Sequence, residues 1–314
     1  MGRPRRRVVA IGDAIVDLVT PPLASLHAGD SQREISGLSI LPGGNATNFA
    51  LQMGTLGMPT SIVACVGSDA FADVLSKAYK SARLDARLRT DPTRATGSTV
   101  ALTWSNGGRA LVTALGANAG LRERDVPGHL LEAADHVHRA GFWWATGLLG
   151  APTARILRRA HRAKAGTSLD VSTDPRGWSL KRVEAVRSCL PHVDTFFGNE
   201  TEVCAVAGVR SPLDAAQRLL DSGADEVVIH RGSEGATWVH GGKVVHSPAF
   251  RVPVDNPTGC GDVFNAGYVF ARLSGASVSE GLGFGNTCAG LHLSDREHPY
   301  PNLAELRRFF RKHA

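Results

Sequence analysis

A short glycine-rich motif near the C-terminus has the residue types that could transfer a phosphoryl group. It reads Val254-Asp255-Asn256-Pro257-Thr258-Gly259-Cys260-Gly261-Asp262, and a helical pattern follows it. Glycines leave backbone N–H groups unobstructed, and a helix N-terminus favours anions, so Gly259, Cys260 and Gly261 predict an anion hole. Asp262 would lie beside the anion and could accept the proton of an attacking hydroxyl. The alternative is that Asp262 only caps the helix.

No other phosphate-binding motif competes with this turn. The sequence contains no G-x-x-x-x-G-K-[ST], which excludes a P-loop. Gly281, Gly283 and Gly285 lack a further glycine at the position that G-x-G-x-x-G requires. Cysteine chemistry is not favoured either, because Cys260 has no evident histidine partner. A nucleotide-handling enzyme with this sequence would therefore hold phosphates at residues 259–262.

The composition describes a folded chain with a basic surface. Of the 314 residues, 43% are hydrophobic and 20% are charged, and the formal net charge of +6 would attract an anionic ligand. Two basic tracts, at residues 3–7 and 307–312, could bind nucleic acid. We favour a solvated arm and the outer face of a last helix, because no nucleic-acid-binding motif accompanies them. No nucleic-acid partner is therefore expected.

The cysteines and the apolar segments indicate in which cellular compartment the protein is expected. The five cysteines are scattered and form no C-x-x-C pair, so neither a disulfide framework nor a zinc ribbon is expected. Residues 8–19 are apolar but interrupted by Asp13 and Asp17, which predicts a first core strand and not a signal peptide. No apolar run reaches the ~18 residues of a membrane span. We therefore expect a cytoplasmic protein with no membrane partner.

Strand-like and helix-like patterns alternate along most of the chain and would position the chemical residues. The patterns predict strands at 8–12, 61–66, 137–143, 167–171, 195–197 and 226–230, and helices at 45–56, 69–84 and 153–165. This alternation favours a parallel sheet with helices on both faces. Ligands bind such sheets beyond the carboxyl ends of the strands.

One region departs from the alternation. Ser98–Trp104 and Arg109–Leu115 are apolar runs of period two joined by Asn106-Gly107-Gly108, a strong hairpin signal, and Ser31–Leu41 also looks extended. We expect a small antiparallel β lid built from about 13–41 and 95–115, which would exclude water from a ligand site. No repeat or linker divides the chain, so residues 1–314 are predicted to form one domain with a lid.

Two segments resemble the signatures of the ribokinase/PfkB family of carbohydrate kinases. Thr258–Asp262, with Phe264 and Gly267, is similar to the C-terminal signature of that family. Pro42–Asn48, with Leu56-Gly57, is similar to its N-terminal signature. The resemblance implies an α/β protein with the three-layer α/β/α ribokinase-like fold, a mostly parallel central sheet and a small antiparallel β lid.

The resemblance also implies a reaction. The γ-phosphoryl group of ATP would pass to a hydroxyl, usually a hydroxymethyl group, of a small sugar or sugar-like polyol. Asp262 would be the general base, and the backbone of Gly259, Cys260 and Gly261 would form the anion hole. The family usually has alanine at position 260, so Cys260 is expected to contribute its backbone and not its thiol. ATP and Mg²⁺ are the implied cofactors, and a requirement for a monovalent cation stays open.

The remaining site residues follow from the same resemblance. It assigns the substrate hydroxyls to Asp13, Asp17, Gly43, Gly44 and Asn48. It assigns the nucleotide to Asn199, Glu202, Gly232, Gly235 and Asn286. Asn199 and Glu202 are also the implied magnesium residues, since they are one helical turn apart and magnesium needs only one or two carboxylates besides phosphate and water.

The substrate itself stays open at this point. A nucleoside kinase of the same family is an alternative, in which Trp104 of the lid could stack on a base, and so is a non-catalytic sensing relative. Asp174 occupies a place where several sugar kinases have arginine, which argues against an acidic substrate. Lids in this family sometimes pair, so a homodimer through the lid also remains open.

Overall fold

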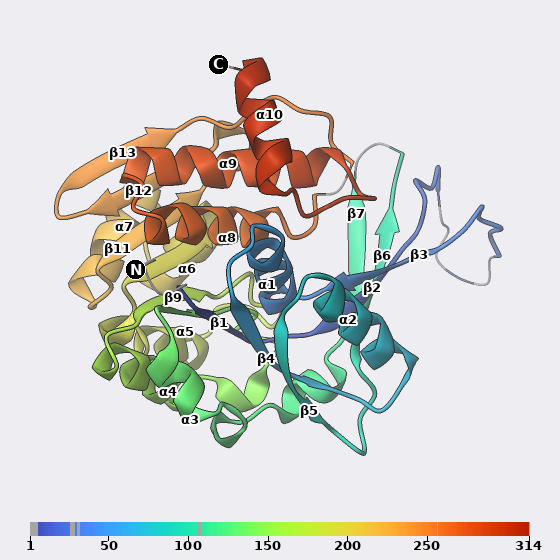
Figure 1. Cartoon of the computed structure of the whole chain (residues 1–314), viewed down its shortest axis with the longest axis horizontal. Helices are drawn as coiled ribbons and strands as arrows, with labels where there is room; N and C mark the ends of the chain where they lie inside the picture. The colour runs from blue at the N-terminus through green and yellow to red at the C-terminus, as the bar shows by residue number, and fades with distance from the viewer. Residues whose placement is uncertain (1–5, 26–28, 30–31, 106–107, 256, 314) are drawn as a thin grey trace, which may run out of the picture.

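The computed structural model describes residues 6–25, 29, 32–105, 108–255 and 257–313. Within these residues, nine strands form one sheet through the centre of the molecule (Figure 1). From edge to edge they are β13 (Lys243–Ser247), β12 (Ala236–His240), β11 (Glu226–His230), β10 (Thr195–Asn199), β9 (Gly166–Asp170), β8 (His136–Arg139), β1 (Val8–Ile11), β4 (Thr60–Val66) and β5 (Asp85–Thr90). Every pairing from β11 to β5 is parallel, while β12 and β13 pair antiparallel.

Two layers of helices cover this sheet (Figure 1). One layer contains α1 (Asn45–Thr55), α2 (Ala70–Ser81), α8 (Cys260–Leu273) and α9 (Val278–Ser294). The other contains α3 (Gly128–Ala133), α4 (Ala151–Arg162), α5 (Leu180–Arg187), α6 (Glu200–Ala207) and α7 (Pro212–Asp221). A last helix, α10 (Leu303–His313), contacts α9.

The strands alternate their side chains between the two helix layers. Phe196 packs with one layer and the next residue, Phe197, packs with the other, and both are fully buried. This is what the two-residue repeat of a strand requires when both faces of a sheet are covered. The three-layer architecture predicted from the sequence is therefore confirmed. Among the described helices, none has the length and hydropathy needed to cross a membrane.

A second, four-stranded sheet forms the lid at the side of the main sheet (Figure 1). Its strands are, in order, β3 (Ser39–Gly43), β2 (Ile15–Val19), β6 (Gly97–Thr103) and β7 (Arg109–Ala114). The outer pairs are antiparallel, and the central pair β2–β6 is parallel. The small β lid is thus confirmed. The predicted hairpin residues Asn106 and Gly107, and the start of the extended stretch at Ser31, lie outside the described residues.

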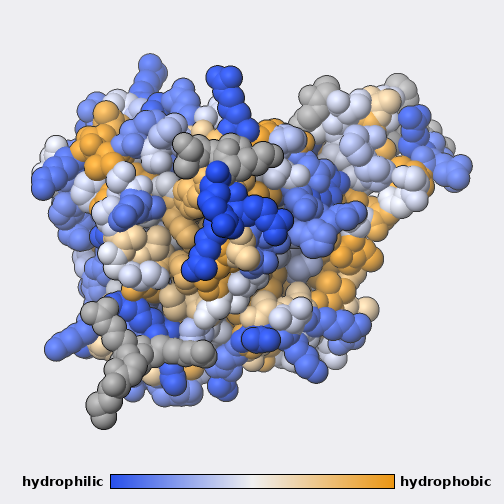
Figure 2. Space-filling model, turned by 45° about the horizontal axis from the view of Figure 1, so that its top comes forward, coloured by the Kyte–Doolittle hydropathy of each residue, from blue (hydrophilic) through white to orange (hydrophobic). Residues whose placement is uncertain are grey.

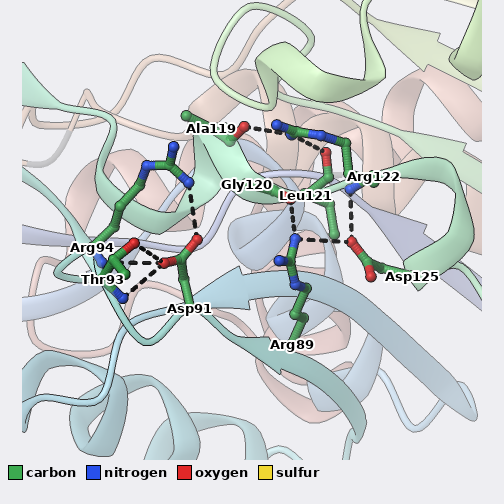
Figure 3. A network of polar contacts seen from close by, with 9 residues as sticks. All are labelled: Arg89, Asp91, Thr93, Arg94, Ala119, Gly120, Leu121, Arg122 and Asp125. Atoms are coloured by element: carbon green, nitrogen blue, oxygen red, sulfur yellow. Dashed lines mark hydrogen bonds and ion pairs between the residues drawn. The ribbon is translucent and has the colours of Figure 1, made fainter.

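The base of the lid is tied to the edge of the main sheet. Figure 3 shows Asp91 accepting hydrogen bonds from the backbone N–H and hydroxyl of Thr93, at 3.0 and 2.9 Å, and from the Arg94 guanidinium at 3.0 Å. These residues lead into β6. On the other side, Arg89 of β5 donates to the carbonyl of Gly120, in the segment that follows β7 (Figure 3). The β6–β7 hairpin therefore extends from a fixed base.

The structure corrects some boundaries. The apolar run 8–19 is two strands, because Gly12 packs against the backbone of Ala140 and Asp13 turns toward α1, so only β1 belongs to the core sheet. Residues 85–90 and 236–247 add strands that were not predicted. The first is largely exposed at an edge of the sheet, where hydrophobic patterning is weak.

Candidate active site

A cavity of about 360 Å³ lies where the lid faces the carboxyl ends of the central strands. The lid contributes Asp17, Thr99 and Arg109, and the loop before α8 contributes residues 257–259. Most of the predicted site residues line it: Asp13, Asp17, Gly44, Asn48, Asn199, Glu202, Gly259, Cys260, Gly261 and Asp262. Residues more than 240 positions apart in the sequence thus share one cavity.

Asp262 lies in the first turn of α8, directly after the glycine turn. Gly259 is the residue before this helix, and its φ of 86° lies in the left-handed region that favours glycine. Asp262 is 4% exposed, and its carboxylate accepts two hydrogen bonds from α1, at 2.9 Å from the Asn48 amide and 3.1 Å from the Asn45 amide. One helix therefore holds the carboxylate that another helix presents to the cavity.

The environment of Asp262 favours its protonated form. Burial raises the pKa of this carboxyl well above its usual range, and the nearby carboxylate of Asp170 raises it further. The hydrogen bonds from Asn48 and Asn45 lower the pKa but do not cancel the effect of burial. A carboxylate of increased proton affinity suits a general base better than an ordinary surface aspartate does.

Asp13 connects the cavity to the start of α1. Its two carboxylate oxygens accept hydrogen bonds from the backbone N–H groups of Asn45 and Ala46, each at 3.1 Å, so it satisfies donors at the helix N-terminus. Burial raises the pKa of Asp13, and these backbone hydrogen bonds lower it. Gly44 precedes α1, and its Cβ, if present, would lie 2.9 Å from the carbonyl oxygen of Asp13. The first role of both residues is thus to build the cavity wall.

Asp17 is the acidic residue that the lid presents to the cavity. Burial, and after it the charge of Asp13, raise the pKa of Asp17 to about 6, while a hydrogen bond with Thr99 lowers it. Gly43 pairs with Ile15, two residues before Asp17 on the neighbouring lid strand, and a Cβ at position 43 would overlap the Asp17 carboxylate. Gly43 does not line the cavity itself, but its lack of a side chain gives Asp17 its place.

Asn199 and Glu202 form a reciprocal cap at the start of α6. The Asn199 side chain accepts from the backbone of Glu202 at 3.0 Å, and the Glu202 carboxylate accepts from the backbone of Asn199 at 2.9 Å. Glu202 also accepts from the hydroxyl of Thr173 at 2.8 Å. Burial, followed by the charge of Asp170, raises the pKa of Glu202. Both side chains face the cavity, so a structural role and a ligand-binding role are compatible.

The donor set suits magnesium bound with a nucleotide. Among the described residues, no group of three or more His, Cys, Asp or Glu side chains could hold a metal ion by itself. Magnesium needs few protein ligands when phosphate oxygens and water complete its shell. The carboxylates of Asp170, Glu202 and Asp262 border the same cavity, and the repulsion among them would be relieved by a cation.

The other residues that were predicted to bind the nucleotide do not line this cavity. Gly235 and Asn286 meet at one loop: the Asn286 amide donates to the carbonyls of Ser247 and Pro248, at 3.0 and 3.1 Å, and a Cβ on Gly235 would overlap the same loop. Gly232 begins the short turn that ends before Gly235. These residues are brought together, but away from Asp262.

Comparison with known proteins adds the family. A sequence model described as pfkB family carbohydrate kinase matches residues 5–302. The chain belongs to this family. Membership in the pfkB carbohydrate kinase family, together with the similarity of the chain to individual kinases, confirms the prediction of an ATP-dependent carbohydrate kinase.

Relatives in the pfkB family include both nucleoside and sugar kinases. An adenosine kinase of Schizosaccharomyces pombe is 27% identical over 270 residues, covering 79% of this chain and 78% of that protein. A ribokinase of Haemophilus influenzae is 26% identical over 260 residues, covering 81% of each. The fold is shared with an E. coli protein assigned as a ribokinase II and solved with ATP and Mg²⁺, with a TM-score of 0.86, 23% identity and coverage of 98% and 100%. That complex is consistent with the expected cofactors ATP and Mg²⁺.

The structure also adds residues that sequence reasoning missed in this pfkB member. Asp170 ends β9, and a carboxylate at the carboxyl end of a parallel strand was a usable signal. It accepts from the Asn265 amide at 2.6 Å, and Asn265 in turn hydrogen-bonds His230 at 2.9 Å, so His230 belongs to the cavity wall. Asp174, the departure from the arginine of several sugar kinases, is buried and paired with Arg182.

Two features of the cavity had no sequence signal. Arg109 of β7 donates to the hydroxyl of Thr258 at 2.6 Å, so the lid touches the loop that forms the anion hole. Trp144, after β8, lines the cavity, whereas Trp104, which was expected to stack on a base, is not among the described lining residues. The backbone of Trp104 pairs with Leu23 instead.

Proposed function

We propose that this chain transfers the γ-phosphoryl group of ATP to a hydroxymethyl group of a small neutral sugar or sugar-like polyol. The observation that supports this best is the buried carboxylate of Asp262, held by two α1 amides directly beside the Gly259 turn. A kinase of this kind needs a base and an anion hole within reach of one acceptor. The cavity that contains Asp262 also contains Asp17, a second, partly buried carboxylate suited to sugar hydroxyls.

Each group has one task in this proposal. Asp17 and Asn48 orient the acceptor through its hydroxyls, and Asp13 supports them from the start of α1. Asp262 takes the proton of the attacking hydroxyl as the bond from that oxygen to the γ-phosphorus forms and the bond from the γ-phosphorus to the bridging oxygen of ADP breaks, so that ADP leaves. The backbone N–H groups of residues 259–261, at the positive end of α8, hold the negative charge of the phosphoryl group. The Cys260 thiol takes no part, because burial raises its pKa to about 12 and keeps it protonated.

The nucleotide is assigned to the side of the cavity near α6 and to the loop beyond it. Glu202 and Asn199 would hold Mg²⁺, which supplies charge neutralisation to the phosphates when bound. Gly235 and Asn286 meet at the Ser247–Pro248 loop, and Gly232 begins the turn that ends before Gly235, so these three residues would bind the rest of ATP. We propose that residues 1–314 act as one kinase domain in which the lid covers the acceptor.

A nucleoside is a second candidate for the acceptor. The specific observation is Trp144, a partly exposed indole in the cavity wall that could stack on a planar base. The relatives that are kinases of nucleosides, such as the fission-yeast adenosine kinase, support the same reading. With a nucleoside acceptor, Trp144→Ala should weaken the binding of nucleosides more than that of free sugars.

We also propose that the chain forms a homodimer through the lid. One row of aligned residues on the lid sheet is apolar, and Ile40, Val100 and Val112 are 50%, 37% and 66% exposed, with Leu18 between Ile40 and Val100. Figure 2 shows hydrophobic side chains along the lid side of the molecule. An exposed apolar row of this kind favours a partner. Sedimentation of the chain and of Val112→Lys would test it, since a monomer in both cases contradicts the dimer.

The central experiment measures ADP release from MgATP with a panel of pentoses, hexoses, polyols and nucleosides. Asp262→Asn is the blank, and it should reduce turnover by ~100-fold or more while leaving ATP binding nearly intact. A loss below tenfold would remove Asp262 as the base. ATP binding without turnover on any acceptor would instead favour a sensing protein.

A further inference from the structure

A second layer of contacts lies beside Asn48, at a small neighbouring pocket that Tyr300 lines together with Asp17 and Asn48. Tyr300, in the segment between α9 and α10, donates its hydroxyl to the Asn48 amide oxygen at 2.9 Å. The same Asn48 amide donates its nitrogen to Asp262 at 2.9 Å. The chain of contacts therefore runs from a tyrosine hydroxyl, through one amide, to the carboxylate that we assign as the base.

The segment that contains Tyr300 is held in place at both sides. The Gln52 amide of α1 donates to the carbonyl of Pro301 at 2.9 Å. The His292 ring of α9 lies between the carbonyl oxygens of Pro299 and Thr258, at 2.5 and 2.7 Å. Tyr300 is thus attached to α1, to α9 and, through His292, to the loop that precedes the anion hole. Its hydroxyl has little freedom to move away from Asn48.

The orientation of the Asn48 amide determines whether a hydrogen-bond donor or an oxygen faces the Asp262 carboxylate. With the nitrogen toward Asp262, the amide stabilises the carboxylate, whereas a reversed amide would turn an oxygen toward it and repel it. The Asn48 nitrogen also lies 2.7 Å from the position that a Cβ on Gly259 would occupy. The amide therefore contacts both the base and the glycine of the anion hole.

The tyrosine hydroxyl is suited to fixing that orientation. Burial, followed by the charges of Asp17 and Asp262, raises the pKa of Tyr300 well above its usual range, so its proton remains available for donation. The hydroxyl donates to the amide oxygen when the nitrogen faces Asp262, and the charged Asp262 carboxylate can accept only from that nitrogen, so the two contacts reinforce one orientation of the amide. Loss of the hydroxyl would leave the oxygen unpaired and allow the amide to turn.

We propose that Tyr300 is a positioning residue for phosphoryl transfer, and that it acts by holding the Asn48 amide with its nitrogen toward Asp262. This inference rests on the proposed function, because it needs Asp262 to be the base. It assigns a role in the reaction to a residue that lies 38 positions after Asp262 and outside both signatures of the family.

The chain offers a matched control. Tyr79 of α2 is fully buried, and its hydroxyl lies 2.8 Å from that of Thr47, the neighbour of Asn48 on α1. Tyr79→Phe and Tyr300→Phe each remove one tyrosine hydroxyl that contacts α1. Only Tyr300→Phe removes a contact that continues to Asp262.

The first test compares turnover of the two variants with MgATP and the acceptor that gives the highest rate in the panel. Tyr300→Phe should lower kcat about five- to tenfold at pH 6.5, with the KM for ATP within twofold of the wild type. The loss should shrink as the pH rises, because a less stabilised Asp262 carboxylate needs a higher pH to lose its proton. Tyr79→Phe should keep the kcat and the pH profile of the wild type.

The second test needs no acceptor. Carbon-13 NMR of aspartate-labelled protein follows each carboxyl with pH, and the signal of Asp262 is the one that Asp262→Asn removes. Tyr300→Phe should move the titration of that signal to higher pH, and Tyr79→Phe should leave it unchanged. An unchanged Asp262 titration in Tyr300→Phe, or an equal change in both variants, overturns the role of Tyr300 but leaves Asp262 as the proposed base. High turnover in Asp262→Asn overturns both this role and the proposed base.

Discussion

The two walls of the cavity are built in opposite ways. The wall that presents Asp262 comes from α8, a helix that is buried from Asp262 to Val269 and packs against α1 and α9. The facing wall is the lid, a sheet of four strands whose other side exposes Ile40 and Val112 to solvent. Packed elements hold atoms more precisely than exposed ones. Under our proposal, the chemical step depends on the rigid wall and recognition of the acceptor on the lid.

The walls also differ in how their polar groups are satisfied. Asp262 has two amide donors from a helix that is itself anchored in the core. Asp17, on the lid, has one hydroxyl partner in Thr99 and the charge of Asp13 nearby. The difference predicts that substitutions near Asp262 affect kcat most. Substitutions on the lid should affect the KM for the acceptor or the closing of the lid over it.

After Asp262→Asn, the largest effect is expected from Gly259→Ala. A methyl group there would lie 2.7 Å from the Asn48 amide nitrogen and would require a left-handed backbone at an alanine, which costs about 1–2 kcal/mol. Turnover should fall about 10- to 100-fold, because both the anion hole and the Asn48–Asp262 contact are displaced. Steady-state kinetics measures the loss, and thermal melting checks that the variant folds.

Gly283→Ala, in α9, is the control for this substitution. A methyl group at position 283 would meet no atom within 4 Å, in a backbone that is already helical. Turnover should stay within about threefold of the wild type, since helices favour alanine over glycine. Equal losses in the two variants would show that the glycine turn is not the rigid part of the site.

The sequence specified the rigid wall better than the lid contacts. Residues 254–262 predict an anion hole from the local sequence alone, because glycine spacing and a following helix are properties of adjacent residues. The lid hairpin was likewise local, through the turn between two apolar runs. Both features needed no knowledge of the three-dimensional arrangement.

Contacts between distant segments could not be predicted in the same way. Arg109 and Thr258 are 149 positions apart, and Tyr300 and Asn48 are 252 positions apart. Whether such side chains meet depends on the packing of whole layers, which patterns of period two or 3.6 do not encode. Asp170 is the intermediate case, since its place at the end of a strand was a signal but its partner Asn265 was not.

A smaller effect is expected where the lid touches the rigid wall. Arg109→Ala removes the hydrogen bond to Thr258 and a cation that faces the anion hole. Since the Arg109 side chain is exposed, kcat should fall only about three- to fivefold, with ATP affinity nearly unchanged. Thr258→Val, which removes the same hydrogen bond but keeps the cation, separates the two contributions. Wild-type kcat in Arg109→Ala would mean that the lid and the anion hole work independently.

The smallest effect concerns the pH dependence of the lid. Because the pKa of Asp17 is raised to about 6, this carboxylate is almost fully charged at pH 8 and half protonated at pH 6. If the charged form accepts hydrogen bonds from acceptor hydroxyls, the KM for the acceptor should double between pH 8 and pH 6. The KM is measured across this range, and in Asp17→Asn, which has no charge to lose, this change should disappear.

The same carboxyl should change the stability of the free protein in the opposite direction. Burial makes the charged form of Asp17 unfavourable in the folded state, so its folded pKa lies above the unfolded value. The destabilisation is fully present above pH 6 and is relieved as the pH falls toward 4. The melting temperature of the wild type, relative to that of Asp17→Asn, should therefore rise as the pH falls from 7 to 4.5. A constant difference would mean that Asp17 is solvated in the free protein, and the lid would then owe its recognition to Thr99 and the neighbouring backbone.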